Sequence, residues 1–171
     1  MDLSRLTPSD AVVTLRGLER RYRGLFAGLA DDESPDDLAH RRAGGWSAAE
    51  HIVAATRAIG AATRALGTVV VTAEPPTLAP EDVAPAQRPK PEAPTGPVHE
   101  RLAELALEAN AAADRIERVP ASDWARTAVV DGDAGRRTVT ALDVARAAVD
   151  AGVTHLREAG EVLATVRAQR P

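Results

Sequence analysis

The chain contains no cysteine. This absence excludes disulfide bonds, thiolate nucleophiles, and zinc or iron–sulfur sites that depend on cysteine ligands. Aromatic residues are also scarce, with two tryptophans, one tyrosine and one phenylalanine in 171 residues. A hydrophobic core must therefore come mainly from aliphatic side chains. The abundant alanines favour helices, because alanine loses no side-chain entropy in a helix.

Long apolar runs and a strong excess of one charge are missing as well. No run approaches the roughly 20 apolar residues that a membrane-spanning helix needs. The segment Met1–Arg5 has neither the basic region nor the apolar region of a signal peptide. The formal net charge is −4, which creates no field that attracts nucleic acid or an anionic membrane. We therefore expect a cytoplasmic protein that binds neither nucleic acid nor membrane.

Apolar side chains recur at helical spacing in four segments, and three of these segments begin with a recognisable cap. Ser47 and Glu50 form the clearest cap, a capping box in which each residue satisfies a backbone N–H of the other. Thr7 and Thr140 have the same position before the first and last segments. The expected helices span 7–29, 47–67, 97–118 and 140–166. We predict an all-α fold, an antiparallel four-helix bundle that forms a single domain over residues 1–171.

The connections between these helices differ in composition. Residues 74–97 hold eight of the twelve prolines, which forbids a helix and predicts a long, extended and partly mobile crossover between the second and third helices. An alternative interpretation is a proline-rich peptide ligand. Residues 69–71, three valines, are expected to be extended, and residues 34–45 to be a loop. Residues 127–139 resemble a short hairpin inserted before the fourth helix.

Two of the four histidines lie near the apolar faces of helices that can be neighbours in a bundle. These are His51 on the second helix and His155 on the fourth, and metal sites in bundles are built from such facing side chains. Zinc needs three or four ligands. Glu50 and Asp150 are carboxylates that could complete the ligand set, but the capping box already explains Glu50. We interpret the histidines as a hydrogen-bonded pair at the edge of the core and expect no metal.

The segment Gly44–His51, which reads Gly-Gly-Trp-Ser-Ala-Ala-Glu-His, resembles the opening of the second helix in the DinB-like superfamily of four-helix bundles. The segment Val149–Leu163 resembles the last helix of that family. The resemblance implies the bundle fold over essentially the whole chain. The family includes thiol-dependent transferases and the mycothiol-dependent maleylpyruvate isomerases of actinobacteria, and the arginine- and alanine-rich composition suits such a host.

The resemblance also implies a divalent metal held by three histidines, but most of these positions do not match. The first ligand position falls on Ala54. The pair on the last helix falls on Ala151 and His155, or, shifted by one residue, on Asp150 and Thr154. At best one ligand of three is present, since an alanine methyl group cannot bind a metal. His51 lies one turn before Ala54, which leaves a rearranged site as an alternative.

Three interpretations of function remain open. The first is a DinB-like protein without a complete metal site, which binds a small molecule in a cleft between helices. The second is a mycothiol-dependent transferase or isomerase with zinc or nickel in a rearranged site. The third, compatible with the first, is a homodimeric interaction module. The catalytic residues are unknown at this stage. The residues expected to line the cleft are Trp46, Glu50, His51, Ala54, Asp150, Ala151 and His155.

Overall fold

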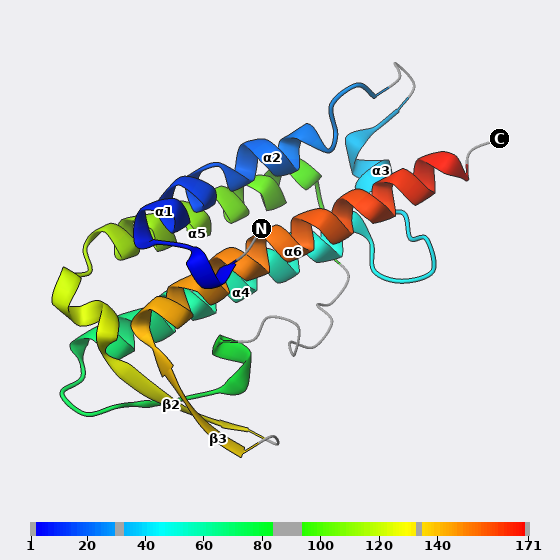
Figure 1. Ribbon diagram of the computed structural model, residues 1–171. Helices are drawn as coiled ribbons and strands as arrows, with labels where there is room; N and C mark the ends of the chain where they lie inside the picture. The colour runs from blue at the N-terminus through cyan, green and yellow to red at the C-terminus, as the bar shows by residue number, and fades with distance from the viewer. Residues whose placement is uncertain (1–2, 30–32, 84–93, 133–134, 170–171) are drawn as a thin grey trace.

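Two long helices, α4 and α6, lie side by side and run in opposite directions (Figure 1). The computed structural model describes residues 3–29, 33–83, 94–132 and 135–169. Helix α5 packs against α4, and α1 and α2 pack against α5. The α-helices of the described residues are α1 (Pro8–Arg16), α2 (Leu18–Gly24), α3 (Pro35–His40), α4 (Ala48–Val71), α5 (Val98–Glu117) and α6 (Ala141–Ala168). The strands are β1 (Thr77–Leu78), β2 (Thr127–Gly132) and β3 (Gly135–Thr140), and the short 3-10 helices are Leu3–Arg5, Pro80–Asp82 and Ala121–Ala125.

All three predicted helix caps are confirmed. Thr7, Ser47 and Thr140 each accept a hydrogen bond from the backbone N–H three residues later, and an acidic side chain at that position returns the bond. These capping boxes fix where α1, α4 and α6 begin, because they satisfy N–H groups that have no partner inside the helix. The predicted third helix is also confirmed, as α5.

The prediction of a purely all-α, antiparallel four-helix bundle is wrong. The chain is mostly helical, but it also forms a three-stranded mixed sheet in the order β1-β2-β3. Strands β2 and β3 are the expected hairpin, paired antiparallel from Thr127 with Thr140 to Gly132 with Gly135. Strand β1 pairs parallel with β2. The sheet lies at one end of the helices, beneath the start of α6 (Figure 1).

Strand β1 comes from the proline-rich connection, which was expected to be extended and partly mobile but was not expected to join a sheet. The N–H of Val129 donates to the carbonyl of Pro76 at 2.8 Å. Proline cannot donate to a sheet, but it is tolerated at an edge, and β1 is an edge strand. Residues 84–93 of the connection lie outside the described residues. Helices α4 and α5, which precede and follow the connection, run in the same direction (Figure 1).

Three boundaries also differ from the prediction. The first helix is divided at Gly17 into α1 and α2. The segment 34–45 contains α3, capped by Ser34. Helix α4 continues past Gly67 to Val71, so the expected extended run of valines is wrong. Val69 is 1% exposed, and its burial outweighs the weak helix propensity of a β-branched residue.

A helix that crosses a membrane must be both long and apolar. None of the helices of the described residues is both long and apolar enough to do so. The expectation of no transmembrane helix holds for this part of the chain.

Candidate metal centre

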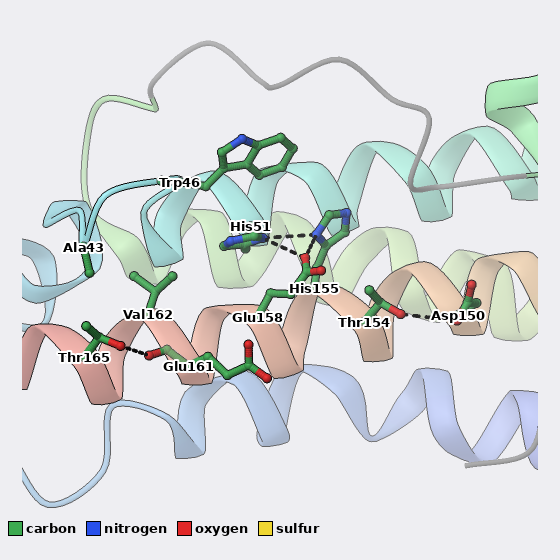
Figure 2. Close-up of a pocket in the computed structure, with 11 residues that line it drawn as sticks. Ala43, Trp46, His51, Asp150, Thr154, His155, Glu158, Glu161, Val162 and Thr165 are labelled. Atoms are coloured by element: carbon green, nitrogen blue, oxygen red, sulfur yellow. Dashed lines mark hydrogen bonds and ion pairs between the residues drawn. The ribbon is translucent and has the colours of Figure 1, made fainter.

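A cavity of about 620 Å³ opens beside the first turns of α4 and the second half of α6. Three parts of the chain line it: the segment before α4, with Trp46, the first turn of α4, with His51, and one face of α6, with Asp150, His155 and Glu158 (Figure 2). The cavity is large enough for a small organic molecule.

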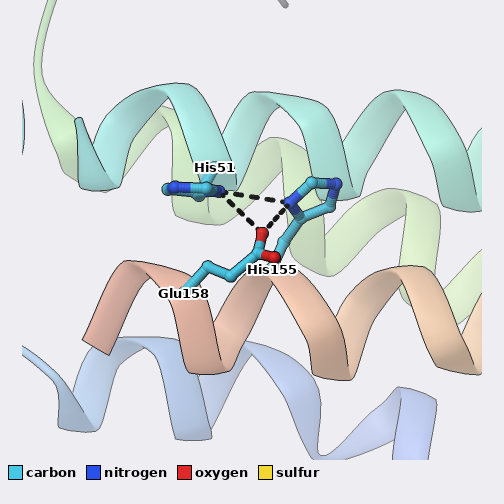
Figure 3. A group of neighbouring side chains, drawn as sticks. All are labelled: His51, His155 and Glu158. Atoms are coloured by element: carbon cyan, nitrogen blue, oxygen red, sulfur yellow. Dashed lines mark hydrogen bonds and ion pairs between the residues drawn. The ribbon is translucent and has the colours of Figure 1, made fainter. Parts of the chain in front are cut away.

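Three potential metal ligands converge in this cavity (Figure 3). The Nδ1 atoms of His51 and His155 are 3.2 Å apart. The Oε2 atom of Glu158 lies 3.3 Å from Nδ1 of His51 and 3.2 Å from Nδ1 of His155. These atoms form a nearly equilateral triangle, in which His51 is 104 residues from His155 in sequence and Glu158 is three residues beyond His155.

The local helix geometry explains this arrangement. His51 is the fourth residue of α4, so the Ser47 capping box determines where its side chain points. His155 and Glu158 are three residues apart on α6, a spacing that puts two side chains on the same face of a helix. The antiparallel packing of α4 and α6 then brings the three side chains together.

Both imidazoles are buried, His51 at 8% and His155 at 6% exposure. Burial lowers the pKa of both histidines below the ordinary value of 6.5, and at His51 the neighbouring His155 lowers it further. Both rings are therefore neutral at pH 7. The two neutral rings share a hydrogen bond through their Nδ1 atoms, and the carboxylate of Glu158 lies against both of these atoms without a full ion pair.

Trp46 covers the histidine pair. Its indole ring stacks on His155 at a centroid distance of 5.9 Å and an interplanar angle of 15°, and it is tilted by 35° against His51 at 5.1 Å. Such ring contacts add attraction beyond the area that they bury. Trp46 therefore forms a wall of the cavity directly over the candidate ligands (Figure 2).

Glu50 holds the segment that carries Trp46. Its Oε2 accepts a hydrogen bond from the Ser47 N–H at 2.6 Å, and its Oε1 accepts one from Arg42 Nη2 at 2.5 Å. Arg42 and Ser47 also form an isolated β-bridge. The carboxylate of Glu50 is 1% exposed and that of its partner Arg42 48%. Glu50 therefore closes the loop from 42 to 47 and does not face the cavity.

The structure brings together four of the seven residues that we expected in the cleft: Trp46, His51, Asp150 and His155 line the cavity. The carboxylate of Glu50 instead accepts hydrogen bonds from the Ser47 N–H and from Arg42. Ala54 and Ala151 are buried at 5% and 0% exposure and do not line the cavity.

Sequence reasoning missed Glu158. The signal that could have found it is the spacing His155-x-x-Glu158, which places a carboxylate one turn beyond a histidine on one helix face. The first histidine of the pair in the resembling family corresponds to a position before His155, at Asp150 or Ala151. The third ligand atom comes from Glu158, which lies after His155 on α6.

The three atoms fit a divalent transition metal in type and in spacing. Two imidazole nitrogens and one carboxylate oxygen suit zinc, nickel or iron, and neutral rings are the state that binds metal. A tetrahedral zinc ion with bonds of about 2.0–2.1 Å holds its ligand atoms about 3.3–3.4 Å apart. The observed 3.2 and 3.3 Å separations match that spacing. Three protein ligands leave a fourth position, as catalytic zinc sites require.

Comparison of the chain with models of protein families finds no match, and comparison with curated proteins finds none.

Proposed function

We propose that this chain binds a divalent metal ion, zinc or nickel, through His51, His155 and Glu158, and that it is a metal-dependent transferase or isomerase. The observation that supports the proposal is the triangle of three ligand atoms at the wall of a cavity. The number of ligands now meets the requirement that two histidines alone did not. The resemblance to DinB-like bundles, carried by Trp46–Glu50 and by the last helix, favours the same chemistry and adds mycothiol as the candidate thiol.

The chain's own residues provide the binding site and its shape. His51 and His155 present neutral nitrogens, and Glu158 supplies the negative charge that a divalent ion requires. A bound metal lowers the pKa of a coordinated thiol or water, which makes it a nucleophile at neutral pH. Trp46 covers the ligands on one side and limits the access of water. We place this activity in the cytoplasm, where a thiol co-substrate stays reduced.

Metal content and ligand variants test the metal centre. The purified chain should retain about one equivalent of zinc or nickel after dialysis, measured by elemental analysis. His51→Gln and Glu158→Gln should each lower zinc affinity at least about tenfold, measured by competition with a coloured chelator. His99→Gln is the matched control, because His99 is exposed and outside the triangle. It should leave zinc affinity unchanged.

Thiol consumption tests the reaction. Metal-loaded protein should accelerate the conjugation of a low-molecular-weight thiol, such as mycothiol, with an electrophilic substrate, and Glu158→Gln should abolish the acceleration. A protein that holds metal but turns over no thiol would contradict the transferase part of the proposal. A protein that takes up no metal would contradict the metal centre itself. It would favour the first interpretation of the sequence, a metal-free protein that binds a small molecule.

The homodimer expected from the sequence stays a prediction. The exposed large hydrophobic residues of the described chain, Val13, Val71 and Leu107, lie on three different helices, and single exposed apolar residues do not mark an interface. Light scattering at micromolar concentration tests it, and a purely monomeric protein would contradict it.

A further inference from the structure

The carboxylates of the cavity are arranged along one helix. Asp150, Glu158 and Glu161 all lie on the face of α6 that lines it (Figure 2). At a rise of 1.5 Å per residue, Asp150 is about 12 Å before Glu158 along the helix axis and Glu161 about 4.5 Å beyond it. Because Glu158 belongs to the proposed metal centre, the other two carboxylates flank that centre on both sides.

Few positive charges balance these two carboxylates. Among the described residues that line the cavity, none is a lysine or an arginine. Asp150 Oδ1 accepts a hydrogen bond from the neutral hydroxyl of Thr154 at 3.3 Å. Glu161 Oε1 lies 3.8 Å from Nε of Arg157, with side chains 69% and 68% exposed. An exposed pair at that distance is weak, so Arg157 only partly neutralises Glu161.

The carboxylates beside the proposed metal centre outweigh the positive charge of the centre. A divalent ion held by two neutral imidazoles and Glu158 has a net charge of about +1, and Asp150 and Glu161 together contribute −2. The surroundings of the metal centre are therefore negative, although the centre itself is positive.

The wall opposite α6 is aromatic. Trp46 lines the cavity above the histidine pair (Figure 2), and an indole face attracts an organic cation through its quadrupole. A molecule whose donor atom occupies the free metal position therefore extends its remainder into a cavity lined by Trp46, Asp150 and Glu161. A positive group is stabilised in that space, and a negative group is repelled.

We propose that this pocket selects a small organic cation, a molecule with one metal-binding atom and an ammonium group that lies beside Asp150 or Glu161. The inference rests on the proposed metal centre and names its substrate class. It disfavours dicarboxylates and other anions as ligands of this site, and it favours a cationic thiol over mycothiol, which carries no ammonium group, as the co-substrate.

Three thiols of the same chain length but different charge provide the probes: thiocholine, 2-mercaptoethanol and 2-mercaptoethanesulfonate. Each is titrated into cobalt-loaded protein, and binding is followed by the thiolate-to-cobalt charge-transfer absorption. The same titrations are made with the double variant Asp150→Asn/Glu161→Gln. Because the thiols differ in their own pKa, the quantity compared is the affinity ratio of thiocholine to 2-mercaptoethanesulfonate in each protein. The control is Glu104→Gln/Asp131→Asn, which changes the net charge equally at exposed residues outside the cavity.

We expect the ratio to fall roughly tenfold in the Asp150→Asn/Glu161→Gln protein and to stay unchanged in the control. The single variants Asp150→Asn and Glu161→Gln should each produce part of the fall, which keeps the test valid if the double variant misfolds. A ratio that is equal in all proteins, while cobalt still binds, would overturn this inference alone. A chain that takes up no cobalt would overturn the proposed function and this inference with it.

Discussion

The hydroxyl of Tyr22 donates a hydrogen bond to the carbonyl oxygen of Gly152 at 3.0 Å, across 130 residues of sequence. Tyr22 is fully buried, and burial raises its pKa far above the ordinary value of 10, so the hydroxyl stays protonated and remains a donor. Gly152 lies one turn before His155. This bond therefore ties α2 to the part of α6 that carries the candidate metal ligands.

Tyr22→Phe removes this bond and little else. We expect it to lower the free energy of unfolding by about 1 kcal/mol, because the ring still fills its site and the Gly152 carbonyl keeps its other lone pair. Urea denaturation followed by circular dichroism measures the change. An unaltered midpoint would mean that the bond contributes nothing net to stability.

Gly152 is a site of close helix packing. A Cβ at this position would lie 2.5 Å from Leu18 Cδ1 and 3.4 Å from Ile59 Cδ1, and both side chains are fully buried. Such overpacking costs about 1–3 kcal/mol, which exceeds the gain of about 1 kcal/mol from replacing a helical glycine by alanine. We expect Gly152→Ala to be destabilising in urea denaturation.

Gly24→Ala is the matched control for that prediction. Gly24 is also helical, but a Cβ there meets nothing within 4 Å. Its replacement should therefore be neutral or slightly stabilising. Equal effects of the two substitutions would show that helix propensity, rather than contact with Leu18, determines the result.

Glu50→Ala should destabilise the protein by roughly 2 kcal/mol, since it removes a buried capping carboxylate together with its bond to Arg42. Asp10→Ala is the control, because Asp10 has the same capping role at an exposed position, and it should cost about half as much. In a Trp124→Phe background, Glu50→Ala should also shift the emission of Trp46 to longer wavelength, as the loop opens to water. Unshifted emission would contradict the role of Glu50 in positioning Trp46.

The features that sequence could predict are those with local causes. The capping boxes at Thr7, Ser47 and Thr140 need only residues three positions apart, and the expected helix starts are confirmed. Two runs with β-branched residues on either side of a glycine-containing turn predicted the hairpin of β2 and β3, and their pairing is confirmed. His51 and His155 were correctly placed near each other because both lie by apolar helix faces.

The features that sequence could not predict depend on distant partners. Thr77 and Leu78 form a strand only because β2 offers them an edge, and the valines at the end of α4 are helical where Val69 is buried by packing. The spacing within α6 places Glu158 beside His155, but both meet His51 only because α4 lies against α6 at a particular register. No pattern within either helix specifies that register.

The stability of the metal-free protein should decrease as the pH falls through the ordinary pKa of histidine. Burial lowers the pKa of His51 and His155 in the folded state below the value of 6.5. Below that value the unfolded chain therefore binds protons that the folded chain excludes. The free energy of unfolding is highest above this value and decreases progressively as the pH falls below it. The slope is at most about 1.4 kcal/mol per pH unit for each imidazole.

Urea denaturation in the presence of a chelator, between about pH 7.5 and 5.5, measures this dependence in a range above the titration of most carboxylates. The double variant His51→Gln/His155→Gln retains His40 and His99 and should lose most of the slope. If the variant kept the wild-type slope, the pH dependence would come from other groups, and the buried pair would not be neutral in the folded protein. A neutral pair is also the state that binds metal without first releasing protons from charged rings, so the same measurement bears directly on how readily the centre fills at neutral pH.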